Sequence, residues 1–207
     1  MWEPVRFLLF SSIETMSAFT LMLAAFRIKV KDFFWSGLFV SLFMNLQSYL
    51  LRGETNLAAF APAISTMIFA FLLVVVVKIP AMWAALIAVL GTFVYTVIQF
   101  VILKTLFAGV DTTTLSSSIE GSLLQLVSSM VVFGISYFLL KFKIGFTSEF
   151  DNFTLQWANI GVVVLIVLGL LGSTLMFYLN DLFLLTIHMA IVAILFLYYA
   201  IKKEREE

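Results

Sequence analysis

Long apolar stretches alternate with short polar breaks along the whole chain. Seven stretches are long enough to span a membrane, because about 20 mostly apolar residues cross its hydrocarbon layer. They cover residues 6–26, 33–51, 57–77, 81–103, 121–140, 155–179 and 182–201. A helix satisfies all its backbone hydrogen bonds internally, as lipid requires. The pattern therefore predicts an all-α fold, a transmembrane helical bundle that forms a single polytopic domain over residues 1–207.

The breaks between these stretches are not equally clear. RIKVKD at residues 27–32, RGETN at 52–56 and KIP at 78–80 are charged and end the first three stretches. The longest break is a loop rich in Ser and Thr at residues 104–121. Only Asn180 and Asp181 separate the last two stretches, so the pattern leaves either six or seven helices open.

Composition supports lipid as the solvent. Apolar residues make up 63 % of the 207 residues and charged residues 12 %, against about 45–50 % and about 25 % in soluble domains. Mean hydropathy is +1.13. The net charge is zero, which gives no indication of nucleic-acid binding.

Lys and Arg are distributed unevenly over the predicted loops. Seven spans place nine of the twelve on one side, namely Arg27, Lys29, Lys31, Lys78, Lys141, Lys143, Lys202, Lys203 and Arg205. Cytoplasmic loops carry the excess of basic residues. We therefore expect the N-terminus outside, the 104–121 loop extracellular and the charged tail 202–207 cytoplasmic, in a bacterial cytoplasmic membrane. The residues expected to dock a cytoplasmic partner are Lys141, Lys143, Lys202, Lys203 and Arg205.

Polar side chains inside the spans concentrate in the predicted outer half. Glu14 is the most unusual, because an acid at the centre of a membrane helix costs about 2.5–3.5 kcal/mol on insertion scales. Such groups face the bundle interior or a cavity. We therefore predict a polar pocket that opens outward. Its candidate ligand-binding residues are Glu14, Asn45, Gln47, Thr96, Gln99, Gln125, Ser128 and His188.

A simpler interpretation competes with this one. Ser, Thr, Asn and Gln also join membrane helices by hydrogen bonds worth about 0.6 kcal/mol on average. The lone His188 fits a packed, hydrogen-bonded residue as well as a ligand contact. For Glu14, we expect an approach to Asn45 or Gln47, because a short link makes the first two helices antiparallel neighbours.

Catalytic and metal-binding patterns do not emerge from the sequence. There is no cysteine and one histidine, so neither a thiolate nucleophile nor a zinc site of three or four such ligands can be assembled. No phosphate-binding loop is present. We expect a protein that is not an enzyme and needs no cofactor or metal.

Two features carry a resemblance at the level of topology. The array of six or seven helices and the charged exit YYAIKKEREE at residues 198–207 resemble the membrane sensor domain of peptide-sensing histidine kinases of the accessory-gene-regulator type. The opening LLFSSIETMSAFTLMLAAFRIKVKDFF and the SYLLRGE step look like those of polytopic membrane proteins of Bacillus and Paenibacillus. The resemblance implies a sensor that binds a peptide or small molecule. In those kinases a phospho-acceptor and an ATP-binding domain follow the last helix; here we expect an isolated sensor module or one that works through a partner.

Three functional hypotheses remain open. The first is a sensor or regulatory subunit that binds its ligand in the outer pocket and signals through a cytoplasmic kinase or another partner. The second is the substrate-binding membrane component of a transporter, which would work with an ATPase. The third is a structural assembly subunit, and a homo-oligomer is compatible with all three.

Overall fold

The computed structural model describes residues 3–51, 61–107 and 119–146, together with 172, 183–184, 187–195 and 198. Its main elements are α1 (Glu3–Ala25), η1 (Val30–Phe33), α2 (Phe34–Leu51), α3 (Ala61–Val75), α4 (Ala81–Leu106) and α5 (Ile119–Phe142). Residues 187–195 are also helical, and no described residue lies in a strand. The predicted all-α class is confirmed for this part of the chain.

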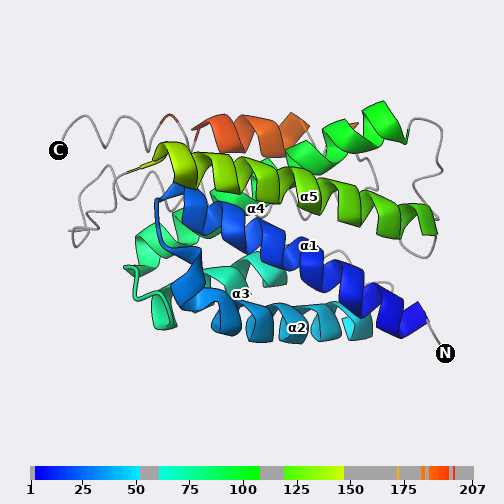
Figure 1. Cartoon of the computed structure of the whole chain (residues 1–207), viewed down its shortest axis with the longest axis horizontal. Coiled ribbons are helices and arrows are strands. Elements are labelled where there is room, and N and C mark those ends of the chain that lie inside the picture. Colours follow the sequence, from blue (N-terminus) through cyan, green and yellow to red (C-terminus); the bar gives the residue numbers. More distant parts are fainter. Residues whose placement is uncertain are drawn as a thin grey trace.

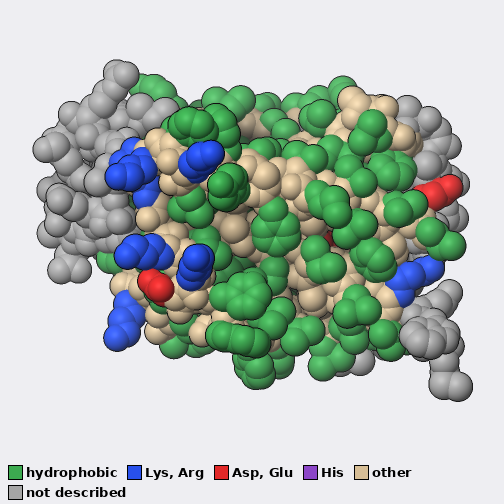
Figure 2. Space-filling model, viewed as in Figure 1, with side chains coloured by type: hydrophobic (Ala, Val, Ile, Leu, Met, Phe, Trp, Pro, Cys, Tyr) green, Lys and Arg blue, Asp and Glu red, His purple; other side chains and the backbone are tan. Residues whose placement is uncertain are grey.

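Within the described residues, three helices are long and apolar enough to cross a membrane: Pro4–Ala25 of α1, Ala81–Leu106 of α4 and Ile119–Phe142 of α5. Hydrophobic side chains are also spread over the whole middle of the face shown in Figure 2. Soluble monomers rarely expose apolar patches of more than a few hundred Å². Helix length and surface together indicate a membrane protein.

Two sequence predictions fall partly outside the described residues. The sixth and seventh apolar stretches are described only in fragments, so the number of seven helices stays a prediction. The predicted loop 104–121 is shorter than expected at both ends, because α4 continues to Leu106 and α5 begins at Ile119. Its central residues 108–118 are not described.

The helices alternate in direction, and α1 lies between three neighbours. Figure 1 shows α1, α3 and α5 ending where α2 and α4 begin. α1 packs against α2, α4 and most extensively α5, while α3 packs against α4 and α2. Any polar side chain on α1 can therefore meet a different helix according to the face on which it lies.

Glycines permit two of these close approaches. A Cβ on Gly37 of α2 would lie 2.6 Å from Cε1 of Phe19 on α1, and a Cβ on Gly91 of α4 would overlap Met22. Small residues let membrane helices approach closely, which increases their van der Waals contact. The core beside these contacts is apolar, and Phe19, Met22 and Phe93 are each at most 1 % exposed.

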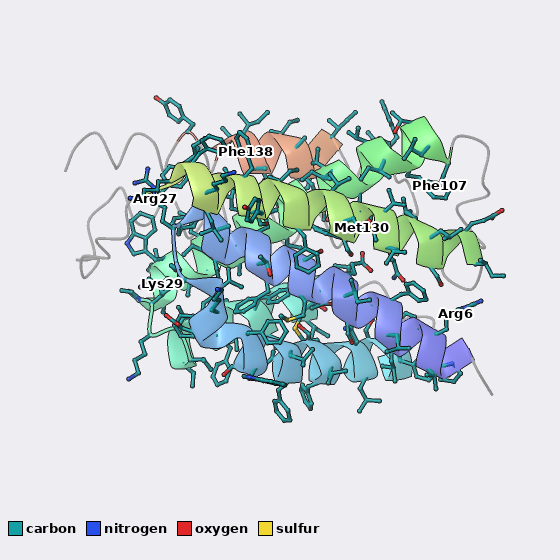
Figure 3. All side chains as sticks on the ribbon, in the orientation of Figure 1. Arg6, Arg27, Lys29, Phe107, Met130 and Phe138 are labelled. Carbon is teal, nitrogen blue, oxygen red and sulfur yellow. The ribbon has the colours of Figure 1, made fainter. Side chains whose placement is uncertain are left out.

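Basic residues terminate three helices at one end of the bundle. Arg27, Lys78 and Lys143 follow α1, α3 and α5 and have positive φ angles of 53°, 63° and 53°. After α1, the Ile28 N–H donates to the Leu23 carbonyl at 2.9 Å, the long-range bond of a Schellman cap. Figure 3 places Arg27 and Lys29 at this end, with Arg6 and Phe107 at the other. We call the end that carries Arg27, Lys29, Lys31, Lys78, Lys141 and Lys143 the basic end.

The basic end is held together by backbone and aromatic contacts. Gly145, with φ of 146°, follows α5 and approaches the Ala25 carbonyl so closely that a side chain could not fit. The next residue, Phe146, donates its N–H to that carbonyl at 2.9 Å. The ring of Phe146 also lies 5.2 Å from that of Phe26, which in turn lies 6.4 Å from Trp83 of α4.

Candidate functional site

Polar side chains from four helices converge on the first half of α1. Residues 100° apart along a helix face different directions, so consecutive polar residues on α1 can reach different neighbours. We call this group the Glu14 layer. Its members are Ser11, Ser12, Glu14 and Thr15 of α1, Asn45 of α2, Gln99 of α4 and Gln125 of α5.

Toward α2, the layer is a buried amide between two hydroxyl groups. Asn45 is 7 % exposed, and its Nδ2 donates to Ser12 Oγ at 3.3 Å. Its Oδ1 lies 3.2 Å from Thr15 Oγ1. Gly37, Ser41 and Asn45 recur every four residues, so the α2 face beside α1 carries small residues that allow this contact.

Toward α4, the layer contains its one carboxylate. Gln99 Nε2 donates to Glu14 Oε1 at 2.8 Å. We expected Glu14 to approach Asn45 or Gln47 of α2, whereas this hydrogen bond comes from α4. Asn45 instead contacts the residues two before and one after Glu14 on α1. α1 and α2 are neighbours as expected, but the rotation of α1 about its own axis brings Glu14 to α4.

Toward α5, the layer continues through Gln125, whose Nε2 donates to Ser11 Oγ at 3.4 Å. One turn closer to the basic end, Tyr95 of α4 places its hydroxyl 3.5 Å from Ser128 Oγ of α5. Tyr95 also lies close to Ser17 and Glu14 of α1. Polar contacts thus connect α1, α4 and α5 at two successive levels.

The remaining predicted ligand-binding residues have other surroundings. Thr96 Oγ1 donates to the Thr92 carbonyl of its own helix at 2.9 Å. Gln47 is half-buried on α2, and its side chain makes no hydrogen bond to another described residue. His188 packs on Gly172, because a Cβ built there would lie 2.6 Å from its Nε2.

The predicted docking residues are described only in part. Lys141 lies in the last turn of α5 and Lys143 just beyond it, and both are exposed. The Lys141 ammonium is 5.9 Å from the centre of the Tyr137 ring. Lys202, Lys203 and Arg205 lie outside the described residues.

Cavities lined by described residues include two that are largely apolar. One of about 410 Å³ follows α2 and α3, and one of about 420 Å³ lies among α1, α4 and α5 near the basic end. No predicted ligand-binding residue lines either of them. The described members of the Glu14 layer are hydrogen-bonded across the helix contacts.

The chemistry of the layer is that of oxygen atoms and amides. In the described part of the chain, no three His, Cys, Asp or Glu side chains are grouped to hold a metal ion. One carboxylate among hydroxyl and amide groups can bind a proton or a cationic group by hydrogen bonds.

The sequence-based selection missed Ser11, Ser12, Thr15 and Tyr95 as site residues. Their signal was present, because they lie within one turn of a selected residue along the same helices. Comparison with models of known protein families, with curated proteins and with solved structures finds no match for this chain.

Proposed function

We propose that the protein is an integral membrane sensor or regulatory subunit, and that the Glu14 layer is its ligand-responsive site. The observation that carries this proposal is the Glu14 carboxylate on the central helix, which accepts a hydrogen bond from Gln99. An ionisable residue within a membrane helix points to function, since it is costly to keep there.

The proposed signal is a small movement of α1. A proton or a cationic ligand group at Glu14 would weaken the bond from Gln99, because the carboxylate charge that strengthens it would be neutralised or shared. α1 continues from Glu14 to Ala25, eleven residues or about 16 Å further on. There its carbonyl binds the Phe146 N–H, so movement of α1 would reach the end of α5.

Lys141 and Lys143 would then present the signal to a cytoplasmic partner, such as a kinase. This part of the proposal includes seven spans, an outside N-terminus and a bacterial cytoplasmic membrane. It is supported by the excess of Lys and Arg at the basic end, which is visible on the left of Figure 2.

Orientation is tested with single cysteines, since the chain has none of its own. Cysteine at position 113, outside the described residues, should react with a membrane-impermeant thiol reagent on intact cells. Cysteine in place of Lys29 should react only after the membrane is opened. The reverse pattern would overturn the orientation and leave the Glu14 layer nearer the cytoplasm.

The sensor proposal is tested with a fluorophore attached to Lys143→Cys in an otherwise unchanged protein. Protons and Na⁺ serve as probes, through a pH titration and through exchange of choline chloride for NaCl. We expect at least one of them to change the fluorescence and Glu14→Gln to remove that change while the protein stays folded.

Glu120→Gln is the matched control, because Glu120 is an exposed carboxylate in the first turn of α5. It should leave the response intact. A parent protein that ignores both probes, or a Glu14→Gln variant that responds like the parent, would contradict the proposal.

A structural assembly role is the second candidate, because hydrogen bonds between the helices favour it directly. In that case Glu14→Gln should lower the stability of the protein or leave it unchanged. Neither probe should change the fluorescence of the label at position 143. The fluorescence experiment therefore separates the two functions.

A further inference from the structure

The outer surfaces of α2 and α3 form an apolar groove. It has a volume of about 410 Å³, and every residue that lines it is apolar. Phe39 and Phe43 of α2 face Met67, Phe71 and Val75 of α3 across it. We call this the α2–α3 groove.

Length relates the groove to one leaflet of a membrane. Along α3 and the residue after it, the lining runs from Ile64 to Val76, a rise of about 18 Å. One leaflet contributes about 15 Å of the roughly 30 Å hydrocarbon layer. Phe39 is 73 % exposed and Phe71 is 68 % exposed, so the groove is accessible from the lipid side.

Positive charge lies where the groove reaches the basic end. Lys78 follows Val76 by two residues, is exposed and has φ of 63°. Lys29 and Lys31 flank Val30 in the η1 region before α2, and both are exposed. Val30, Val76 and Val77 pack against the same core cluster. Figures 1 and 3 show the end of α3 and Lys29 at the same end of the bundle.

The chemistry of the groove therefore has two parts, a hydrocarbon channel of leaflet length and a basic mouth. Asp32 is the one acidic residue between Lys29 and the start of α2, so positive charge predominates there. An amphiphile with an anionic head and a long apolar chain complements both parts. A neutral hydrocarbon or a soluble anion would complement only one.

We propose that the α2–α3 groove is a binding site for an anionic phospholipid. One acyl chain lies between Phe39, Phe43, Met67 and Phe71, and the headgroup phosphate meets Lys78 and Lys31. This site is separate from the Glu14 layer and does not depend on which side of the membrane the basic end occupies.

The headgroup is tested by native mass spectrometry of protein taken from vesicles of equal parts phosphatidylglycerol and phosphatidylcholine. The parent should retain phosphatidylglycerol preferentially. Each juxtamembrane lysine contributes about a fivefold preference for anionic lipid. Lys78→Gln and Lys31→Gln should each reduce the preference by about this factor. Lys104→Gln, near the far end of α4, should not.

The acyl chain is tested with cysteines at two equally exposed methionines. Met67 in the groove is 65 % exposed and Met130 on α5 is 64 % exposed. A bulky thiol label at position 67 should remove the retained phosphatidylglycerol, and the same label at position 130 should leave it in place. Thermal unfolding of each labelled protein checks that the fold survives.

The proposal requires both results. Lipid retention that falls equally with Lys104→Gln would indicate attraction to the surface charge in general. If the lysine variants lose the retained lipid but the label at position 67 does not displace it, the acyl chain does not lie in the groove. A protein dimer that the label at position 67 disrupts would assign the groove to a second copy of the chain. Each of these three outcomes overturns the lipid site.

Discussion

Replacing Gly91 of α4 by alanine should destabilise the bundle, whereas the same change at Gly134 of α5 should not. Helix propensity alone would stabilise both variants by about 1 kcal/mol, because glycine is the less favourable helix residue. Packing separates the two positions. A methyl group on Gly91 would overlap Met22, which is 1 % exposed, while one on Gly134 would meet nothing within 4 Å.

The expected difference follows from the cost of overfilling a packed core, about 1–3 kcal/mol. The propensity gain is shared by both variants and cancels when they are compared. Gly91→Ala should therefore be less stable than Gly134→Ala by about 1–3 kcal/mol. Gly37→Ala should behave like Gly91→Ala, because its Cβ would lie 2.6 Å from the ring of Phe19.

The free energy of unfolding can be measured for each purified variant in mixed micelles, by titration with sodium dodecyl sulfate and circular dichroism. The parent and Gly134→Ala provide the reference values. Equal stability of Gly91→Ala and Gly134→Ala would refute the close approach of α1 and α4. A loss at Gly134 would show that this face of α5 is covered by another element or molecule.

Three further changes test the caps and the layer. Lys143→Gly should raise the unfolding temperature, with a gain of up to about 1 kcal/mol, because glycine removes the Cβ strain at positive φ; an unchanged or lower temperature would contradict the left-handed cap. Gly145→Ala should destabilise by more than about 1 kcal/mol, and wild-type stability in the same thermal assay would exclude its contact with Ala25. Gln99→Leu should cost about 1–3 kcal/mol by removing a donor from a carboxylate. A double-mutant cycle that combines Gln99→Leu with Glu14→Leu should then show coupling between the two side chains. Strictly additive changes in the free energy of unfolding would exclude their hydrogen bond.

The helices could be predicted from the sequence because membrane thickness sets their length. The stretch 121–140 became α5, Ile119–Phe142, and the stretch 81–103 became α4, Ala81–Leu106. The depth of each residue along its helix could also be predicted from the sequence, because each helical residue advances about 1.5 Å. Glu14, Asn45, Gln99 and Gln125 were placed in the same half of the bundle, and the structure brings them together around α1.

The partners within the layer could not be predicted in the same way. Hydropathy is similar all around such a helix, so it does not fix the rotation of α1 about its own axis. That rotation depends on contacts far apart in sequence, such as Gly91 with Met22. The expected neighbour of Glu14 was chosen from the short link to α2, whereas Glu14 accepts a hydrogen bond from Gln99, 85 residues later.

The helix caps at the basic end could not be predicted from the sequence either. Glycine is the usual residue at positive φ, and a search for glycine would have missed Arg27, Lys78 and Lys143. Their charge was visible in the sequence and predicted the side of the membrane, but it carried no information about backbone conformation.

The central position of α1 has a consequence for biosynthesis. Its mean hydropathy of 1.6 is below the values of 2.4 and 2.0 for α4 and α5, yet it is the first of them to leave the ribosome. At about 5–20 residues per second, the 85 residues between Glu14 and Gln99 take about 4–17 s to translate. Asn45 is translated much sooner. A hairpin of α1 and α2 is therefore the first assembly in which the hydroxyl groups of Ser12 and Thr15 can contact Asn45. Until α4 is translated, the least apolar of the three helices carries its carboxylate without the hydrogen bond from Gln99.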